Sequence, residues 1–280
     1  MTYSGIKTID VTEKQMEQFY SNMDKNIFHL EQNQYLVLKT PEGKLIGPYV
    51  WHESEGHTET LYRKFSSKMF GDVKPKDKDP YQIAYMDSLA HNQLTFCTGP
   101  AGSGKTQIAL AYAFEQLERG AIGKIVVFCN PYVATGAVKM GFYPGSKIEK
   151  LMESSVGSVL LSKLGGRDNV QRLLDQEELI LMPMGDCRGY EVPKDSFVYF
   201  TEAQNTSRYL MKLFLQRTND TCKICVEGDE RQVDHDGFEN GLNGLNAAIE
   251  VFCGEDYAGH VRLENIYRGR IAKRAELICD

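Results

Sequence analysis

Residues 99–106 read GPAGSGKT, which places glycines, a lysine and a threonine at the spacing of a phosphate-binding loop. An apolar stretch precedes the loop and the helix-forming stretch KTQIALAYAFEQLERG follows it, which is the strand–loop–helix setting that such a loop requires. Backbone N–H groups and the helix N-terminus would then point at phosphates. We expect Lys105 to hold the β- and γ-phosphates of ATP and Thr106 to offer its hydroxyl to Mg²⁺. The other residues predicted to contact the nucleotide are Gly99, Pro100, Ala101, Gly102, Ser103 and Gly104.

The second half of such a site is expected at residues 196–205, SFVYFTEAQN, where an apolar strand ends in Thr201-Glu202. Phosphate-loop hydrolases usually carry Asp-Glu here, the aspartate for Mg²⁺ and the glutamate for the attacking water. Glu202 is therefore the predicted catalytic base and, with Thr106 and Thr201, a predicted metal-site residue. Because threonine carries no charge, we expect weaker Mg²⁺ binding and slower turnover, but not their loss. The alternative for Glu202 is a solvent-exposed carboxylate at a strand end.

A third polar turn is VEGDERQVD, residues 226–234, at the end of another apolar strand. Asp229 and Gln232 fit a G-D-x-x-Q arrangement, in which the glutamine reaches the γ-phosphate or the water and the aspartate steadies the strand end. If Asp229 lies beside Thr201 in the sheet, it restores part of the missing charge near the metal. An ordinary acidic turn is the alternative.

Arginines matter because phosphoryl transfer spreads negative charge over the γ-phosphate oxygens. The candidates are Arg188, Arg217 and Arg268, and Arg268 is the predicted catalytic one. A solvated surface position stays open for each of them. Upstream of the loop, Tyr81 could stack on adenine and the Gln82 amide could pair with the edge of the base, although a helix-start glutamine is also common at the surface.

These residues require a sheet that brings strand ends together. Short apolar runs predict strands at 93–99, 124–130, 178–184, 197–202, 223–229 and 260–266. Helical stretches lie between them at 104–119, 147–164, 206–217 and 240–252. Strands that alternate with helices predict an α/β fold, with a mostly parallel sheet flanked by helices.

The first 75 residues differ from this pattern, and we expect a small N-terminal appendage over residues 1–75 and an ATPase core over residues 76–280. The stretch QYLVLKTPEGKLIGPYVW, residues 34–51, predicts a β-hairpin around Pro41-Glu42-Gly43. The charged segment DVKPKDKDP, residues 72–80, is typical of a linker.

The composition of the chain excludes several classes of protein. Hydrophobic residues make up 42% and charged residues 25%, as in a packed globular protein, and the net charge of −6 argues against a broad basic surface for DNA. No run of about 18 apolar residues predicts a membrane span. The seven cysteines, most of them in apolar stretches, and the lack of an apolar signal core at the N-terminus favour a cytoplasmic protein without disulfides.

Taken together, the motifs from about Tyr81 to Ala275 resemble the PhoH family of P-loop ATPases, which are related to superfamily-one helicases. The resemblance is carried by TFCTGPAGSGKT, VVFCNPYVATGAVKMGFYPGSKIEK, CRG, TEAQNTSRYLMKLFLQR, EGDERQVD and the late Arg268. Gln204 corresponds to the glutamine of the family's E-A-Q-N motif and is assigned to the nucleotide site with Asp229. Two departures are Thr201 in place of the family's aspartate and Asn130 in place of its arginine, with Lys139 as a nearby basic residue that could compensate for Asn130.

The resemblance implies ATP and Mg²⁺ as ligands, hydrolysis of ATP, and coupling to RNA or single-stranded DNA in a helicase-like manner. It also implies a homo-oligomer, such as a hexameric ring in which an arginine reaches the neighbouring subunit. Short divergent forms of this kind are familiar from bacteriophages. The alternative function is a nucleotide-dependent binding or assembly protein with little hydrolysis, which Thr201 and Asn130 favour.

Overall fold

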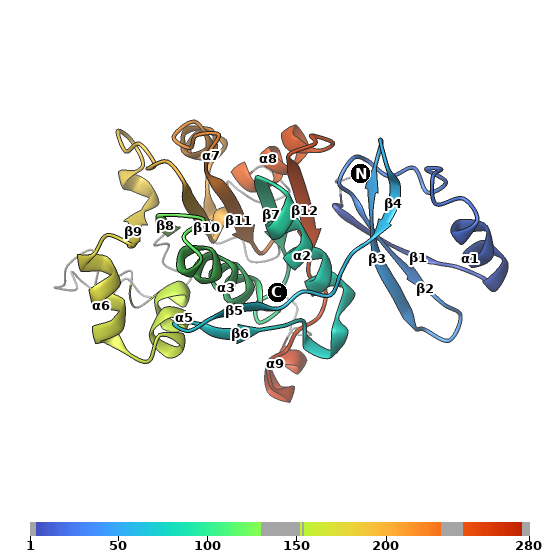
Figure 1. Ribbon diagram of the computed structural model, residues 1–280, viewed down its shortest axis with the longest axis horizontal. Coiled ribbons are helices and arrows are strands. Elements are labelled where there is room, and N and C mark those ends of the chain that lie inside the picture. The colour runs from blue at the N-terminus through green and yellow to red at the C-terminus, as the bar shows by residue number, and fades with distance from the viewer. Residues whose placement is uncertain (1–3, 130–151, 153, 231–242, 276–280) are drawn as a thin grey trace.

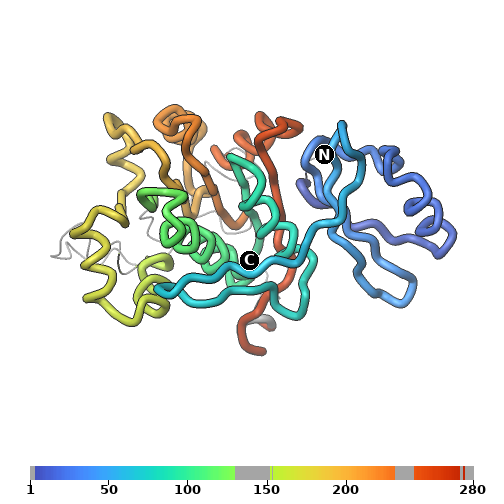
Figure 2. Tube along the Cα trace, viewed as in Figure 1, coloured from blue at the N-terminus to red at the C-terminus, as the bar shows by residue number. Residues whose placement is uncertain are grey.

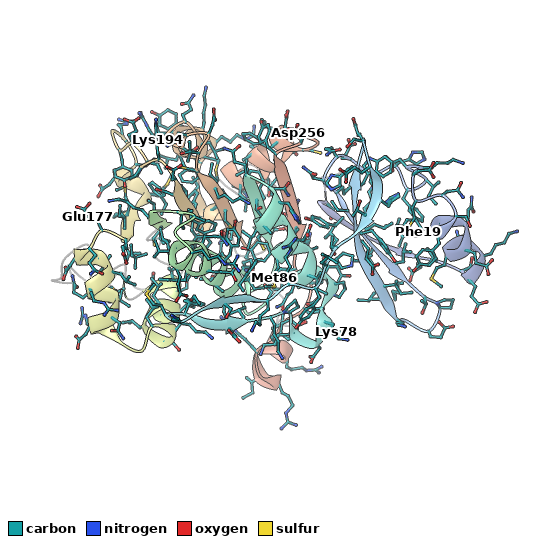
Figure 3. All side chains as sticks on the ribbon, viewed as in Figure 1. Phe19, Lys78, Met86, Glu177, Lys194 and Asp256 are labelled. Atoms are coloured by element: carbon teal, nitrogen blue, oxygen red, sulfur yellow. The ribbon has the colours of Figure 1, made fainter. Side chains whose placement is uncertain are left out.

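The computed structural model describes residues 4–129, 152, 154–230 and 243–275. Two parts are distinguished in Figure 1: an N-terminal lobe built on the sheet β1 to β4, and a core built on a six-stranded sheet. Buried aromatic and aliphatic side chains fill both parts, with Phe19 in the N-terminal lobe and Met86 near the middle of the molecule (Figure 3).

The core sheet has the strand order β12-β7-β11-β10-β8-β9, and every neighbouring pair is parallel. Helices cover both faces, so the strands consist mainly of buried apolar residues. All carboxyl ends lie at one edge, where ligands of such sheets bind. The strands are β7 (Leu94–Thr98), β8 (Lys124–Cys129), β9 (Leu179–Pro183), β10 (Ser196–Thr201), β11 (Lys223–Gly228) and β12 (Ala258–Arg262).

Two groups of helices pack on the two faces of this sheet. One hydrophobic cluster joins the sheet to α2, α3, α5 and α6, and a second joins its other face to α7 and α8 (Figure 1). The helices are α2 (Pro80–His91), α3 (Lys105–Glu118), α5 (Ser155–Lys163), α6 (Arg167–Asp175), α7 (Arg208–Leu215), α8 (Gly244–Phe252) and α9 (Arg270–Ala275), with the short 3₁₀ turns η1 (Lys76–Lys78), η2 (Met184–Asp186) and η3 (Ala203–Asn205). None of the helices in the described part of the chain is both long and apolar enough to cross a bilayer.

The N-terminal lobe contains the predicted hairpin. Strand β2 pairs antiparallel with β3 and parallel with β1, and β3 pairs with β4. Helix α1 starts with a capping box, in which Thr12 and Gln15 bond each other's backbone N–H, and it packs Phe19 against Tyr49. The elements are β1 (Ile6–Asp10), α1 (Glu13–Tyr20), β2 (Tyr35–Lys39), β3 (Leu45–His52) and β4 (Gly56–Glu59).

Buried polar contacts attach the N-terminal lobe to the core. The Tyr35 hydroxyl donates to the Asp87 carboxylate at 3.1 Å. The ring of His260 accepts a hydrogen bond from the N–H of Gly5 at 3.1 Å and bonds the hydroxyl of Thr98, the last residue of β7, at 3.0 Å. The lobe therefore reaches the strand that leads into the phosphate loop.

The chain between the lobe and the core is folded rather than a free linker. Strands β5 (Phe65–Ser67) and β6 (Gly71–Val73) form a hairpin that crosses the core beside α3, as the tube in Figure 2 shows. The N–H of Ser66 donates to Glu115 of α3 at 3.0 Å. Turn η1 follows, and Lys76 donates its N–H to Gln82 at 2.8 Å. The segment 72–80 thus packs against the start of α2.

The predicted fold class is confirmed by the six-stranded parallel sheet between two helical layers. Each predicted core strand is present, although β12 begins at Ala258 and ends at Arg262, earlier than the predicted 260–266. Helix α6 and the β5–β6 hairpin were not predicted. In α6 the apolar residues Val170, Leu173 and Leu174 do recur at helical spacing, so this signal was overlooked, whereas β5 and β6 have three residues each and are too short to show a period.

Candidate nucleotide site

The loop 99–106 connects β7 to α3 with a backbone that only glycine adopts easily. Gly102 has φ = 82°, and a Cβ there would lie 2.5 Å from Cγ of Arg268. Gly104 has φ = 100° and precedes the first residue of α3, with the Gln82 amide 2.9 Å from the position of a Cβ. Larger residues would therefore be strained and would meet the side chains that surround the loop.

Hydrogen bonds within the loop hold it in a compact shape. The Lys105 ammonium donates to the carbonyl oxygens of Gly99 at 2.7 Å and Pro100 at 3.1 Å. The Ser103 hydroxyl donates to the Pro100 carbonyl at 2.8 Å. A helix of 14 residues begins at Lys105, so its N-terminal N–H groups and the lysine charge lie together at the predicted phosphate position.

Glu202 follows β10 in a left-handed backbone conformation, with φ = 54°. It lines the same pocket as Lys105 and Thr106, so the structure brings the predicted base and the phosphate loop together. Burial raises the pKa of the Glu202 carboxyl, and the charges of Glu227 and Asp229 act in the same direction. The hydrogen bond from Gln204 and the charge of Lys105 act in the opposite direction. A carboxylate with a raised pKa is a better base.

Gln204 holds two strand ends together. Its amide nitrogen donates to the Glu202 carboxylate at 2.9 Å, and its amide oxygen accepts the N–H of Asp229 at 3.1 Å. Gln204 is buried and lies outside the pocket lining, whereas Asp229 lies in it. In this structure Gln204 therefore orients Glu202 rather than facing the pocket.

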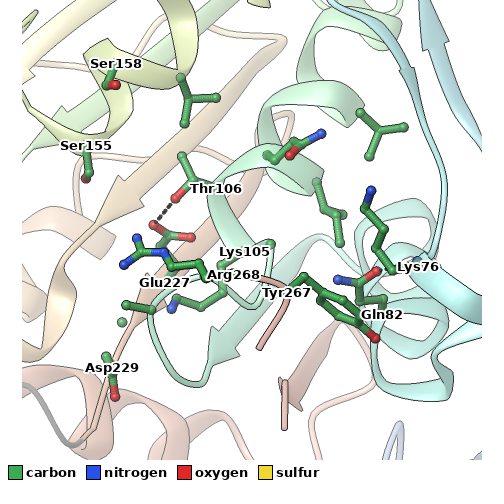
Figure 4. Close-up of a pocket in the computed structure, with 18 of the residues that line it drawn as sticks. Lys76, Gln82, Lys105, Thr106, Ser155, Ser158, Glu227, Asp229, Tyr267 and Arg268 are labelled. Carbon is green, nitrogen blue, oxygen red and sulfur yellow. Dashed lines mark hydrogen bonds between the residues drawn. The ribbon is translucent and has the colours of Figure 1, made fainter. Parts of the chain in front are cut away.

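A carboxylate that was not among the sequence candidates lies at the centre of the site. Glu227 of β11 accepts hydrogen bonds at 2.8 Å from both the Thr106 hydroxyl and the Thr201 hydroxyl, on the same oxygen, Oε1. Figure 4 shows Thr106 facing Glu227, with Lys105 and Arg268 in the same part of the pocket. Strand β11 lies between β7 and β10, so Glu227 reaches both halves of the predicted site.

The three candidate arginines are far from equivalent. Arg268 lines the pocket and its side chain lies against Gly102 of the loop. Arg188 is exposed and donates to the Tyr209 hydroxyl at 3.0 Å. Arg217 is partly buried at the end of α7 and is not among the pocket-lining residues. Of the three, Arg268 is the one that lies beside the loop 99–106.

The pocket has a volume of about 520 Å³, a size that suits a nucleotide. Gln82 lines it, but its amide is engaged by the backbone, with Nε2 donating to the Ser103 carbonyl at 2.7 Å. Tyr81 does not line it, because its hydroxyl bonds Thr8 of the N-terminal lobe at 2.8 Å. Lining residues outside the sequence candidates include Val73, Lys74, Lys76, Ser155, Ser158 and Tyr267.

The donor set suits a nucleotide with Mg²⁺. Within residues 4–129, 152, 154–230 and 243–275, no three His, Cys, Asp or Glu side chains gather so as to hold a metal by themselves. Mg²⁺ in nucleotide sites takes few protein oxygens and is completed by phosphates and waters. Thr106 and Glu227 line the pocket and offer such oxygens beside the loop. Thr201, which was predicted at the metal, does not line the pocket, because its buried hydroxyl donates to Glu227. The second oxygen of Glu227, Oε2, has no hydrogen-bond partner within the described part of the chain.

Comparison with known proteins gives the family. The sequence model of the family described as "PhoH-like protein" matches residues 73–280. The chain belongs to the PhoH family. The match begins at the end of β6, so the N-terminal lobe lies outside it.

Relatives of this PhoH-like chain include Protein PhoH2 of Bacillus subtilis, which is 28% identical over 98% of this chain and 63% of its own length. Protein PhoH of Escherichia coli is 32% identical over 69% of this chain and 54% of its own length. The PhoH-like chain thus spans less than two thirds of these relatives. Among solved structures, a Pyrococcus furiosus Hef helicase domain is similar with a TM-score of 0.35 and 12% identity, over 65% of this chain and 37% of that one.

Not every predicted residue of this PhoH-like chain can be placed. Gln232, Asn130 and Lys139 lie outside the described residues. Glu227 was missed because sequence spacing pointed to Asp229, two positions further on. The sequence signal for Glu227 was an acidic residue inside the otherwise mostly apolar strand KICVEG, because carboxylates are rarely buried without a partner.

Proposed function

We propose that this chain binds and hydrolyses ATP with Mg²⁺ and that nucleic acid stimulates the hydrolysis. The observation that carries the proposal is that Glu202 and the loop residues Lys105 and Thr106 line one pocket. Membership of the PhoH family supports a nucleotide-dependent ATPase.

Each residue has a distinct task in this proposal. The loop N–H groups and Lys105 bind the phosphates, since Lys105 can leave the Gly99 and Pro100 carbonyls for a stronger anionic partner. Glu202 orients the attacking water and accepts its proton, and Gln204 holds the Glu202 carboxylate. Arg268 stabilises the charge that develops on the transferred group. Mg²⁺, when bound, supplies charge neutralisation at the β- and γ-phosphates.

A local surface supports the nucleic-acid part of the proposal. Helix α7 starts soon after Glu202 and presents Arg208, Tyr209 and Lys212 as exposed residues. Tyr209 is 59% exposed, and the guanidinium of Arg188 lies 6.0 Å from the centre of its ring. Exposed cations bind backbone phosphates and an exposed ring can stack on a base. Turn η3 and helix α7 follow Glu202 directly in the chain. Nucleic acid bound at α7 could therefore change the position of the Glu202 carboxylate, the predicted catalytic base.

The first experiment measures phosphate release from Mg²⁺-ATP by the wild type and by Glu202→Gln, with Glu17→Gln on the exposed face of α1 as the matched control. We expect Glu17→Gln to equal the wild type and Glu202→Gln to lose about 10²–10⁴-fold. Equal release by all three chains would remove Glu202 from its role.

The second experiment adds single-stranded RNA or single-stranded DNA of mixed sequence. We expect stimulation of phosphate release, and we expect Tyr209→Ala to reduce it without changing the rate in the absence of nucleic acid. Equal stimulation of phosphate release in wild type and Tyr209→Ala would show that Tyr209 of α7 does not contact the nucleic acid. We also propose that the chain forms a homo-oligomer, as the family resemblance implies. Sedimentation with and without ATP tests this, and a monomer under both conditions would contradict it.

The absence of an aspartate at position 201 favours a second candidate, a nucleotide-dependent binding or assembly protein with little hydrolysis. That protein would bind ATP, yet its phosphate release would be as slow as that of Glu202→Gln. The two candidates are therefore separated by the first experiment.

A further inference from the structure

Two strand ends meet at one carboxylate. Strands β10 and β11 run parallel with Phe200 beside Val226, and the next residues along each strand are Thr201 and Glu227. The hydroxyl of Thr201 donates to Oε1 of Glu227 at 2.8 Å. The carboxylate of Glu227 therefore lies next to the position where an aspartate is absent from β10.

The same carboxylate oxygen is also bonded to the phosphate loop. The Thr106 hydroxyl donates to it at 2.8 Å, so its single proton is directed at Glu227. With the proton held there, the lone pairs of the Thr106 oxygen are free to bind a cation. A hydroxyl ligand that donates to a carboxylate is a better ligand, because the carboxylate raises the electron density of the oxygen.

The second carboxylate oxygen of Glu227, Oε2, is buried in the protein interior without a hydrogen-bond partner among the described residues. Glu227 is 3% exposed, and its Oε2 makes no hydrogen bond within normal distance to any part of the chain that the structure describes, although the Tyr199 hydroxyl lies near enough that its pKa is raised by burial and also by Glu227. No salt bridge joins it to Lys105 or Arg268, although all three side chains line the pocket (Figure 4). A buried oxygen of this kind costs free energy unless a ligand binds it.

We propose that Glu227 is the carboxylate that secures the divalent cation of the nucleotide, and that it supplies from β11 the charge that Thr201 lacks on β10. This inference rests on the proposed nucleotide site. Oε1 orients the Thr106 and Thr201 hydroxyls, and the carboxylate would supply negative charge beside the cation. Thr201 is then a positioning residue for Glu227.

The test measures metal dependence of binding rather than turnover. The fluorescent nucleotide N-methylanthraniloyl-ADP is bound to the protein, and Mg²⁺ is titrated against wild type, Glu227→Gln and Glu230→Gln. Glu230 is the matched control, since it pairs with Arg262 at 3.2 Å and does not line the pocket. We expect Glu227→Gln to raise the half-saturating Mg²⁺ concentration by about 10–100-fold, and Glu230→Gln to leave it unchanged.

A double variant tests whether a carboxylate at position 201 on β10 can replace the carboxylate at position 227 on β11. Thr201→Asp with Glu227→Thr keeps one carboxylate and one hydroxyl at the two strand ends. We expect it to fold and to recover most of the Mg²⁺ affinity that Glu227→Gln loses. Recovery would support the inference, and a folded double variant that binds Mg²⁺ as poorly as Glu227→Gln would contradict it.

The outcomes separate the two claims. A wild-type chain that binds no nucleotide, with or without Mg²⁺, would overturn the proposed function and this inference with it. A wild type with strong Mg²⁺ dependence that Glu227→Gln fully retains would overturn the inference alone. If Glu227→Gln does not fold, the double variant decides.

Discussion

The side chain of Gln204 joins Glu202 to Asp229: it donates to the Glu202 carboxylate at 2.9 Å and accepts the N–H of Asp229 at 3.1 Å. This bridge fixes the carboxylate of β10 to the end of β11 without occupying the pocket. A rigid base is expected to be more effective than a free one, because its hydrogen bonds need no rearrangement during the reaction.

The bridge predicts a change in the pH profile. The Gln204 hydrogen bond lowers the pKa of Glu202, against the upward effect of burial. In Gln204→Leu the pKa of Glu202 rises further, so the base is deprotonated only at higher pH. We expect the acidic limb of kcat to move to higher pH and kcat at its maximum to fall roughly tenfold, less than on removal of the base itself. An unchanged limb would show that Gln204 does not act on Glu202.

Thr201→Asp tests the charge balance at the two strand ends. From the sequence alone, an aspartate at 201 would increase turnover if Thr201 weakens the site, and would leave turnover unchanged if another residue compensates for Thr201. In the structure its carboxylate would face Glu227, which the Thr201 hydroxyl now contacts at 2.8 Å. Two like charges at this distance repel. We expect no gain in phosphate release and a loss of about 2 kcal/mol in the free energy of unfolding by urea without Mg²⁺. A large gain in turnover would contradict the role of Glu227.

Lys105→Met tests the phosphate position. Lys105 bonds two loop carbonyls, so its ammonium lies in the loop before a nucleotide arrives. A hydrogen bond to a charged group contributes about 1.5–3 kcal/mol, so we expect ADP to bind roughly 10–100-fold more weakly by calorimetry. Lys124→Met is the control, since Lys124 is the first residue of β8, pairs with Glu177 and does not line the pocket. Equal affinities of the two variants would show that Lys105 does not bind the phosphates.

His260 predicts a pH dependence of stability. Burial lowers its pKa from 6.5 to about 3, so the folded chain keeps the ring neutral over a range in which the unfolded chain binds a proton. The contribution of His260 to the free energy of unfolding is therefore complete above pH 6.5. It is lost as the pH falls from 6.5 toward 3, by about 1.4 kcal/mol per pH unit.

His260→Gln keeps a donor for Thr98 and an acceptor for Gly5 but cannot be protonated. Urea unfolding at pH 7, 6 and 5 should therefore show a smaller decline for the variant than for the wild type. Parallel declines would mean that His260 is not the group responsible.

Local sequence patterns were sufficient to predict the fold, the loop 99–106 and Glu202, but not Glu227. The loop 99–106 and the strand ending at Glu202 are continuous motifs, and buried parallel strands give apolar runs that are easy to recognise. The position of Glu227 depends instead on the order of strands, because β11 lies between β7 and β10 although it follows both in the chain. Spacing pointed to Asp229, whereas the register places Glu227 beside Thr201.

Contacts between distant segments explain the other differences. Tyr81 was expected at the adenine, but the N-terminal lobe supplies Thr8 as its partner. The segment 72–80 was expected to be a linker, yet Lys74 and Lys76 line the pocket. Neither contact leaves a periodic signal in the sequence, because each is made by a segment far away along the chain.

The most direct test of the central claim is phosphate release from Mg²⁺-ATP by wild type and Glu202→Gln, with nucleotide binding measured in parallel. We predict that both chains bind the nucleotide and that only the wild type releases phosphate at an appreciable rate. Equal release by the two chains, or no binding of nucleotide by the wild type, would contradict the account.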